Sequence, residues 1–270
     1  RVFKILDTQD QTETGGSIDL AQMEGAIAFE NVVFGYLPEE AVLKGISFEV
    51  SKGETLAIVG ATGAGKSTII NLLNRFYGIQ SGRISIDGHN INALSLKGLR
   101  SHIAVVLQDV FLFADTIENN ISLGNSEVSL SEIEAAAKEI GVHDFIESLP
   151  GGYQFNVKER GGMLSSGQRQ LIAFLRAYVT KPSILVLDEA TSSIDSASEQ
   201  LIQKATDTIT KGRTSIVIAH RLATIQKASN ILVMDAGVIV EQGTHEALLK
   251  KGGYYKNLYE AQFLSLAVVE

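Results

Sequence analysis

The chain has 270 residues, of which 45% are hydrophobic and 20% charged. This composition is typical of a folded globular protein rather than a disordered or fibrous one. Its formal net charge of -8 gives no overall attraction to nucleic acid, so we expect no nucleic-acid partner. The absence of cysteine excludes disulfides, thiolate zinc sites and thiol nucleophiles, and no apolar run approaches the roughly 18 residues that span a membrane.

The chain opens on RVFKILD and continues with a polar segment, residues 8–23, that contains a Gly-Gly pair. Polar, glycine-containing stretches between patterned segments are typical of linkers. We therefore expect residues 1–24 to be a linker from a domain absent from this chain, and residues 25–270 to form the folded unit.

Strand patterns follow. From Ala26, apolar and polar residues alternate in AIAFENVVFGY and again in ISFEV, which predicts short antiparallel strands. Four β-rich apolar runs then predict strands that are buried on both faces; they are residues 55–60, 102–108, 183–189 and 214–220. Helical patterns at 67–76 and 198–209 lie between them, and this alternation predicts an α/β fold with a parallel sheet.

Residues 110–166 break the alternation, because residues 129–149 have a helical pattern and no comparable apolar strand run interrupts it. We expect an inserted α-helical subdomain here. After it, ILVMDAGVIVEQG predicts a hairpin that turns around Asp235, Ala236 and Gly237. A last helix is expected from His245 to Leu266.

The octapeptide GATGAGKS, here called the phosphate loop, fits the spacing G-x-x-x-x-G-K-[ST]. In such a loop the backbone N–H groups and the start of the following helix face phosphates. We expect Lys66 to contact the β- and γ-phosphates and Ser67 to bind Mg²⁺. A glycine-rich turn with only a structural role is the alternative, but the flanking strand and helix favour nucleotide binding. The loop alone does not choose among kinases, GTPases, helicases and transport ATPases. The expected nucleotide ligands are Gly60, Ala61, Thr62, Gly63, Ala64, Gly65, Lys66, Ser67 and Thr68.

The apolar run of residues 184–187 ends in Asp188 and Glu189, which places two carboxylates at the carboxyl edge of the predicted sheet. Asp188 is suited to the Mg²⁺ shell and Glu189 to polarising an attacking water. A solvated acidic cap is the alternative.

With these motifs in place, Leu164-Ser165-Ser166-Gly167-Gln168 resembles the LSGGQ signature of the ABC (ATP-binding cassette) ATPases. The resemblance runs from about Ala26 to the end of the chain and implies a P-loop NTPase fold with a RecA-like core. It also implies that Ser165 and Gly167 contact the γ-phosphate bound by a second, head-to-tail subunit. Ser166 replaces a family glycine: either it has an ordinary φ, or this half-site is weaker, as in an asymmetric heterodimer. The segment also suits a helix N-cap.

Other positions match the same family one by one. Tyr36 resembles the aromatic residue on which adenine stacks, with a core tyrosine as the alternative. Gln108 resembles the glutamine that ligates Mg²⁺ and senses the membrane domain, and His220 the histidine that reaches the γ-phosphate. Asp195 resembles the aspartate that crosses the dimer interface. The resemblance implies Glu189, His220, Lys66 and Gln108 as catalytic residues, and Ser67, Gln108 and Asp188 as metal ligands.

Two segments resemble exporters of the multidrug and lipid type. Residues 157–161 are similar to the loop that touches the membrane domain, and RVFKILD to the extension of the last transmembrane helix. The resemblance implies an ATPase that uses ATP and Mg²⁺ to drive export, held at the cytosolic face of a membrane by a transmembrane domain. An importer ATPase, a soluble ABC ATPase and a nucleotide binder that does not hydrolyse remain as alternatives.

Overall fold

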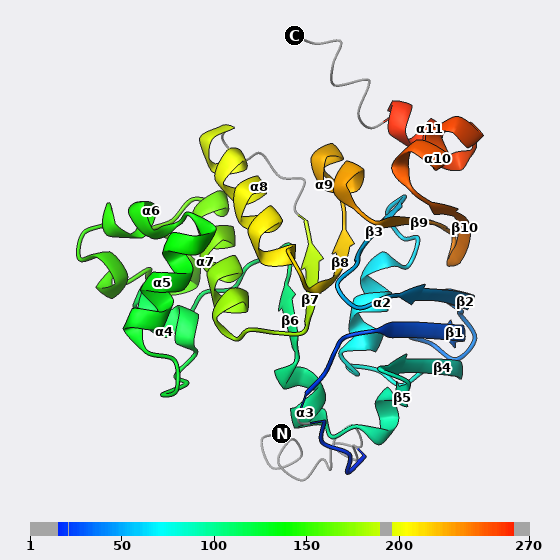
Figure 1. Cartoon of the computed structure of the whole chain (residues 1–270), viewed down its shortest axis with the longest axis horizontal. Coiled ribbons are helices and arrows are strands. Elements are labelled where there is room, and N and C mark those ends of the chain that lie inside the picture. Colours follow the sequence, from blue (N-terminus) through cyan, green and yellow to red (C-terminus); the bar gives the residue numbers. More distant parts are fainter. Residues whose placement is uncertain (1–15, 21, 190–195, 262–270) are drawn as a thin grey trace.

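The computed structural model describes residues 16–20, 22–189 and 196–261. A six-stranded sheet lies between a helical region and a second, four-stranded sheet (Figure 1). In sheet order the six strands are β10 (Val238–Gly243), β9 (Asn230–Asp235), β3 (Thr55–Gly60), β8 (Thr214–Ile218), β7 (Ile184–Asp188) and β6 (Ile103–Val106).

The predicted parallel strands are confirmed. The runs at 55–60, 102–108, 183–189 and 214–220 contain β3, β6, β7 and β8, which pair in parallel. The predicted hairpin is also confirmed as β9 and β10. Its first strand pairs in parallel with β3 and so widens the sheet. All the carboxyl ends except that of β10 therefore meet at one edge.

Strand β3 shows how both faces of this sheet are covered. Ala57 and Val59 belong to one buried cluster, which includes helices α7 (Ser166–Val179) and α8 (Ser196–Thr210). Leu56 and Ile58 belong to the other, which includes α2 (Lys66–Leu73) and the second sheet. Successive side chains of a strand point to opposite faces of the sheet. A run of apolar residues without a polar interruption therefore forms a strand that packs into a hydrophobic core on each face.

The second sheet is antiparallel, as predicted, in the order β2 (Leu43–Val50), β1 (Ile27–Phe34), β4 (Ser81–Ile86) and β5 (His89–Asn90). Phe29 and Phe48 stack across β1 and β2 with their ring centroids 4.5 Å apart. The prediction missed β4 and β5, although Asp87 and Gly88 between them both have positive φ. An Asp-Gly pair of this kind is typical of a two-residue hairpin turn.

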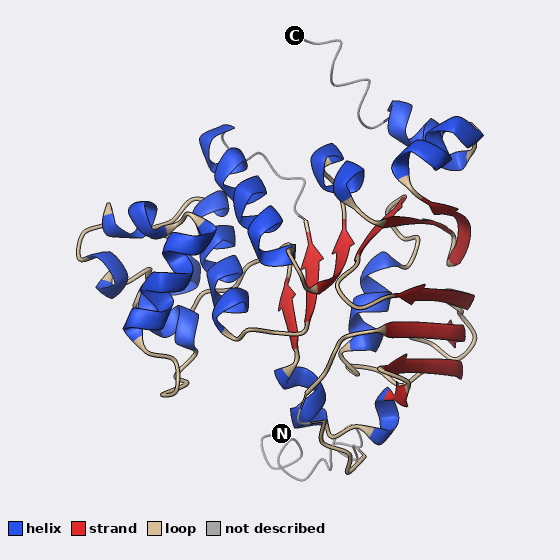
Figure 2. Ribbon diagram, in the orientation of Figure 1, coloured by secondary structure: helices blue, strands red, loops and turns tan. Residues whose placement is uncertain are grey.

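The helical region holds α4 (Ile117–Ser122), α5 (Leu130–Ile140) and α6 (His143–Glu147), and it lies at the other end of the molecule from the four-stranded sheet (Figure 2). The helical pattern of residues 129–149 corresponds to two helices, α5 and α6, rather than to one. A capping box of Ser129 and Glu132 starts α5, and Gly141, with φ 81°, ends it in the left-handed conformation.

Two other predicted helices also end earlier than expected, in each case close to a residue with positive φ. The helix expected from His245 to Leu266 is two short helices, α10 (His245–Lys251) and α11 (Tyr254–Tyr259), because Gly252 with φ 70° caps the first; residues 262–266 lie outside the described part. Helix α2 ends at Leu73 rather than at residue 76, and Arg75 has φ 51°. The helix predicted over 198–209 is confirmed as α8. Helices α3 (Leu96–Ser101) and α9 (Leu222–Lys227) complete the core.

Part of the polar segment predicted as a linker is held against the folded unit. Gly16 and Ile18 donate backbone hydrogen bonds to Asn92 and Ala93, and Ser95 donates its hydroxyl to Asp19 at 2.6 Å. Within the described residues, no helix combines the length and apolar character needed to cross a membrane.

Candidate active site

The phosphate loop joins β3 to α2 through a backbone that requires glycine at Gly60 and Gly65. A Cβ on Gly60 would lie 2.1 Å from the carbonyl oxygen of Met234, and Gly65 caps α2 with φ 96°. The adjoining β9 therefore presses against the start of the loop, and the left-handed cap turns the chain directly into α2.

Lys66 is folded back over this loop. Its Nζ donates to the carbonyl oxygens of Gly60 at 2.8 Å and Ala61 at 2.9 Å, and only 9% of the residue is exposed. Burial lowers the pKa of Lys66, and the carboxylate of Asp188 opposes that shift. The loop thus carries a partly desolvated ammonium group beside an acidic side chain.

Two of the three predicted metal ligands lie together: Asp188 at the end of β7 and Ser67 at the end of the phosphate loop. Burial raises the pKa of Asp188, against the charge of Lys66 and a hydrogen bond with Ser67, while Asp109 raises it further. Asp109 follows Gln108, which is exposed just beyond β6. A carboxylate beside a hydroxyl offers the oxygen ligands that Mg²⁺ takes when phosphates and water complete its shell.

His220 follows β8 and completes this edge of the sheet. Burial lowers the pKa of its imidazole, and the positive charge of Lys66 lowers it further. Both causes favour the neutral ring, which retains one N–H donor.

Glu189 is the most deeply buried residue of the predicted catalytic set, with 3% of its surface exposed. Its Oε1 accepts the hydroxyl of Thr224 at 2.6 Å, and its Oε2 accepts the backbone N–H groups of His220 and Arg221, each at 3.2 Å. Burial raises the pKa of Glu189, and these hydrogen bonds and the charge of Arg221 oppose the shift.

Tyr36 lies beside the other end of the loop, with 47% of its surface exposed. Its hydroxyl is 3.3 Å from Oγ1 of Thr68 and accepts a hydrogen bond from Asn71 at 3.1 Å. Its ring makes edge contacts with Phe34 and Tyr77, at centroid distances of 5.0 and 5.1 Å. Tyr36 is therefore a surface aromatic that is hydrogen-bonded to α2, next to the loop, rather than a core tyrosine.

The predicted signature, residues 164–168, forms the start of α7. Ser165 is the N-cap and Gln168 closes a capping box with it, so the N-cap interpretation is confirmed. Ser166 is the first residue of the helix and has no positive φ, which settles the backbone question raised by this substitution. Asp195 lies outside the described residues.

Comparison with known proteins now adds to this geometry. A sequence model of the ABC transporter family matches residues 43–192. The chain belongs to the ABC transporter family. It corresponds to the ATP-binding domain, an ATPase with a P-loop NTPase fold.

Several relatives resemble this ABC domain over nearly its whole length. It is 49% identical over 97% of its residues to the ATP-dependent lipid A-core flippase of Saccharophagus degradans, of which it covers 44%. It is 48% identical over 97% of its residues to the probable multidrug resistance ABC transporter ATP-binding/permease protein YheH of Bacillus subtilis, of which it covers 39%. The ABC domain thus spans less than half the length of these relatives.

A solved structure described as that of a bacterial Atm1-family ABC exporter with ATP bound is also similar. The TM-score is 0.86 at 42% identity, covering 97% of this chain and 46% of the other.

The structure brings some of the predicted site residues of the ABC domain together and leaves others apart. Lys66, Ser67, Asp188, Glu189 and His220 meet at the carboxyl edge of the six-stranded sheet, with Tyr36 and Thr68 at the loop. In the described part of the chain, none of the hydrogen bonds joins the signature to these residues.

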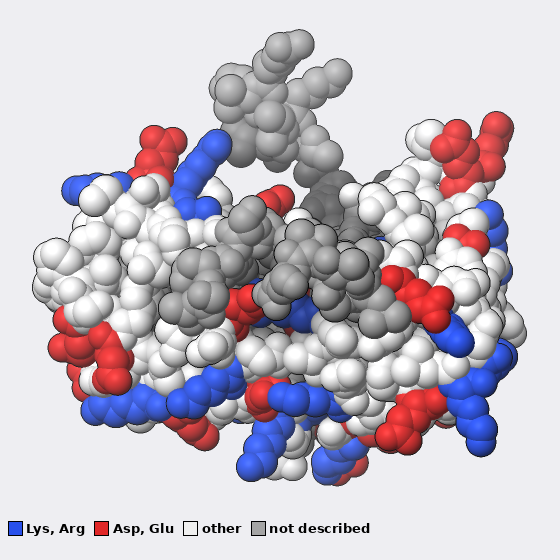
Figure 3. All heavy atoms as spheres, turned by 90° about the horizontal axis from the view of Figure 1, so that it is seen from above, with Lys and Arg blue, Asp and Glu red and all other residues white. Residues whose placement is uncertain are grey.

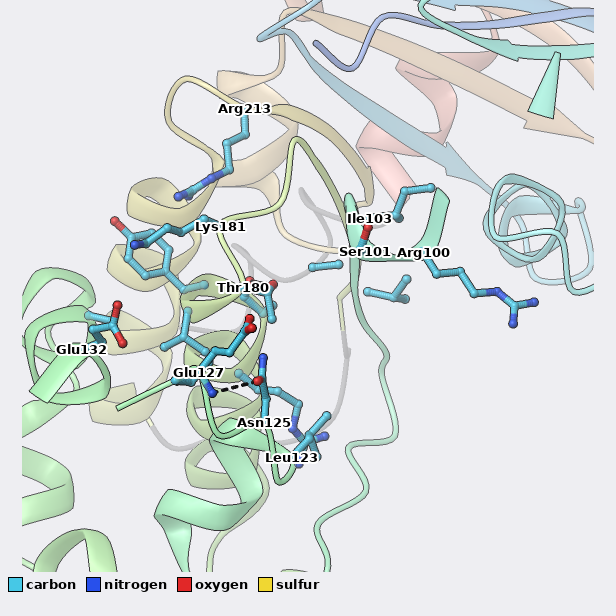
Figure 4. Close-up of a pocket in the computed structure, with 18 of the residues that line it drawn as sticks. Arg100, Ser101, Ile103, Leu123, Asn125, Glu127, Glu132, Thr180, Lys181 and Arg213 are labelled. Carbon is cyan, nitrogen blue, oxygen red and sulfur yellow. Dashed lines mark hydrogen bonds between the residues drawn. The ribbon is translucent and has the colours of Figure 1, made fainter. Parts of the chain in front are cut away.

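A separate cavity of about 840 Å³ lies between β6 and the helical region (Figure 4). Residues such as Arg100 and Ile103 line one side of it, and Asn125, Glu127 and Thr180 the other. None of the predicted site residues that the structure describes lines this cavity, so we do not expect ATP to bind there.

The charged side chains on the face seen in Figure 3 do not indicate a second anion-binding site besides the phosphate loop. Small groups of acidic and basic side chains alternate around its rim. The described residues on this face form no broad basic surface.

Sequence reasoning missed Thr224, which contacts Glu189 directly. The only available signal was its position four residues after His220, at the start of a helical pattern. No spacing rule used above connects such a threonine to a carboxylate that lies 35 residues away in sequence.

Replacing Tyr36 by Ala is expected to weaken ATP binding by about 1 kcal/mol, or about fivefold in Kd, through the loss of one ring stack. Isothermal titration with ATP and with inorganic triphosphate measures the effect. Tyr36→Phe keeps the ring and loses only the contacts of the hydroxyl with Thr68 and Asn71, so it should bind ATP nearly as the parent does. An equal loss for inorganic triphosphate would instead make Tyr36 a support for the loop.

Proposed function

We propose that this ABC domain powers export across a membrane, and that two such domains close head to tail on two ATP molecules. One arrangement carries the proposal: Lys66, Asp188, Glu189 and His220 converge where β3, β7 and β8 end. Phosphoryl transfer needs mainly positioning and charge stabilisation, and these four groups are suited to both.

Each side chain has a role that its surroundings support. Lys66 binds the β- and γ-phosphate oxygens, since its ammonium already lies over the loop. His220 is neutral and donates its one N–H to the γ-phosphate. Glu189 accepts a hydrogen bond from the attacking water and polarises it.

Ser67, Asp188 and Gln108 are the proposed protein ligands of Mg²⁺. The carboxyl group of Asp188 is hydrogen-bonded with Ser67 and its pKa is raised by burial, so a cation there would relieve an unfavourable buried charge. Bound Mg²⁺ supplies neutralisation of the charge on the phosphate oxygens.

The second half of each ATP site comes from the signature of the other domain. Ser165, Ser166, Gly167 and Gln168 start α7. The N–H groups of Ser165 and Gln168 are used in the capping box, while those of Ser166 and Gly167, together with the helix dipole, favour an anion. Because Ser166 has a helical backbone, its Cβ adds no strain there. This supports a working half-site despite the substitution, with Asp195 proposed at the interface.

The coupling to export rests on the relatives, whose names describe a flippase and an ATP-binding/permease protein. We infer that a transmembrane domain supplies the rest of their length and holds this domain at the cytosolic face. Residues 157–161 are suited to contact it. Val157 anchors the segment in the core, while Lys158 and Arg160 are exposed with φ of 61° and 53°, a conformation uncommon outside glycine.

A mixture of two inactive variants tests the head-to-tail arrangement. Ser165→Arg blocks the signature and leaves the phosphate loop, whereas Lys66→Met disables the loop and leaves the signature. Each variant alone should release almost no phosphate from Mg-ATP. An equal mixture should recover about a quarter of the parent turnover, because half of the dimers are mixed and each of these has one intact site of two.

The same mixture with a Ser165→Arg and Lys66→Met double variant in place of either single variant is the control, since it offers no complete site. A mixture of the two single variants that stays as inactive as this control would contradict sharing of sites between domains. Activity of Ser165→Arg alone would contradict the role of the signature.

A further inference from the structure

Thr224 uses its hydroxyl differently from the other helical threonines around it. Thr206, Thr208 and Thr210 of α8 each donate to the backbone carbonyl four residues earlier, at 2.8 to 2.9 Å, as threonine in a helix commonly does. Thr224, in the first turn of α9, donates instead to the side chain of Glu189 at 2.6 Å. Only 5% of Thr224 is exposed, so this bond is shielded from water.

The rest of the Glu189 carboxylate is held by the same turn. Arg221 is the N-cap of α9, but its side chain makes no capping hydrogen bond. Glu189 takes that place from the end of β7 and accepts the backbone N–H groups of His220 and Arg221. The carboxylate is thus fixed between β7 and α9 by three donors in the described part of the chain.

The Glu189 carboxylate can accept one more hydrogen bond in this arrangement. An ionised carboxylate offers about four acceptor positions, and three donors occupy Glu189 here. Two of them are backbone groups that no side-chain substitution removes. Thr224 is therefore the one side chain of this set that fixes Oε1, since the terminal torsion of glutamate has only a broad preference of its own.

We propose that Thr224 is a positioning residue for hydrolysis, and that its hydroxyl holds Glu189 so that the remaining acceptor position faces the attacking water. This inference rests on the proposed role of Glu189 as the group that polarises water. A base held in one orientation by neighbouring donors acts without reorganisation in the reaction. Losing the hydroxyl should slow the chemical step and leave ATP binding unchanged.

Thr224→Val and Thr224→Ser separate the hydroxyl from the packing. The valine keeps the branched shape without the donor, and we expect kcat for Mg-ATP to fall about tenfold with KM within about twofold of the parent. The serine keeps the donor and loses a methyl group, and it should recover most of the lost kcat. Thr206→Val is the matched control, because Thr206 is also buried and its hydroxyl donates only to a helix carbonyl; its kcat should equal that of the parent.

A double variant ties the effect to Glu189. If Thr224 acts through that carboxylate, adding Thr224→Val to Glu189→Gln should lower the residual kcat by no more than about twofold. A full tenfold further loss, an equal loss in the valine and serine variants, or a parental kcat in Thr224→Val would each overturn the inference. Failure of the underlying role of Glu189 has a different result, namely near-parental hydrolysis by Glu189→Gln alone.

Discussion

Glu189→Gln is expected to lower ATP turnover by at least about a hundredfold, the scale of a lost general base. The substitution preserves the shape of the side chain and removes the charge that polarises the attacking water. Phosphate release at saturating Mg-ATP measures the loss. Nucleotide affinity should remain near that of the parent, because Lys66, Ser67 and Tyr36 are unchanged.

The surroundings of Glu189 explain why the variant should keep its fold. The glutamine amide oxygen can accept the N–H groups of His220 and Arg221, while its NH₂ group donates to the hydroxyl oxygen of Thr224. With binding intact and hydrolysis stopped, two variant domains should close on ATP and stay closed. Size-exclusion chromatography should show a larger species with Mg-ATP than with ADP.

Glu241→Gln is the matched control, since Glu241 is also buried and also accepts a backbone N–H, from Tyr255 at 2.8 Å. It lies on β10, away from the proposed site, and its turnover should stay near the parental value. Hydrolysis near the parental rate in Glu189→Gln would remove Glu189 from the mechanism. Loss of turnover without the larger species would contradict closure of two copies of this chain on ATP.

The parallel sheet could be predicted because each of its strands is recognisable from its own residues, without knowledge of the neighbouring strands. Runs such as residues 184–187 are apolar at every position, and only a strand covered on both faces uses such a run fully. Strand β4 was missed because its first three residues are exposed and only its last three are buried. A pattern that short is lost without knowledge of the neighbouring β1.

Helix limits were the less predictable part, and the reason is local. Gly141 and Gly252 both end helices in the left-handed conformation, and glycine within a helical pattern was not treated as a stop. Arg75 adopts a positive φ after α2 without any glycine at all. Its guanidinium donates to the carbonyl oxygens of Ile91 and Leu94, partners that the sequence alone does not show.

The candidate site divides in the same way. Motif spacing predicted which residues gather at the sheet edge, because the carboxyl ends of parallel strands must meet there. It did not predict where the side chain of Glu189 points, since a rotamer depends on partners from a distant segment. Thr224 was missed for this reason, and the backbone of Ser166 was known only once the start of α7 was known.

Lys66→Met is expected to weaken binding of Mg-ATP about a hundredfold, since hydrogen bonds to charged groups contribute about 1.5–3 kcal/mol. Methionine retains an apolar chain of similar length and removes the ammonium. Burial lowers the pKa of Lys66, so the charge is unfavourable in the nucleotide-free domain, whereas its hydrogen bonds to Gly60 and Ala61 are favourable. Because these two effects oppose each other, removal of the ammonium should change the melting temperature little. The loss should therefore appear only when nucleotide is present.

Thermal unfolding with and without nucleotide separates these two effects. At an ATP concentration of about a hundred times the parental Kd, binding should stabilise the parent by about 2.7 kcal/mol and the variant by only about 0.4 kcal/mol. Lys211→Ala, which alters an exposed lysine outside the site, should keep the full ATP-dependent rise. If Lys66→Met keeps that rise as well, the ammonium over the loop does not bind the phosphates and its bonds to Gly60 and Ala61 are only structural. A large fall in the melting temperature without nucleotide would contradict the expected small effect on the free domain, and would show that the ammonium also stabilises the loop itself.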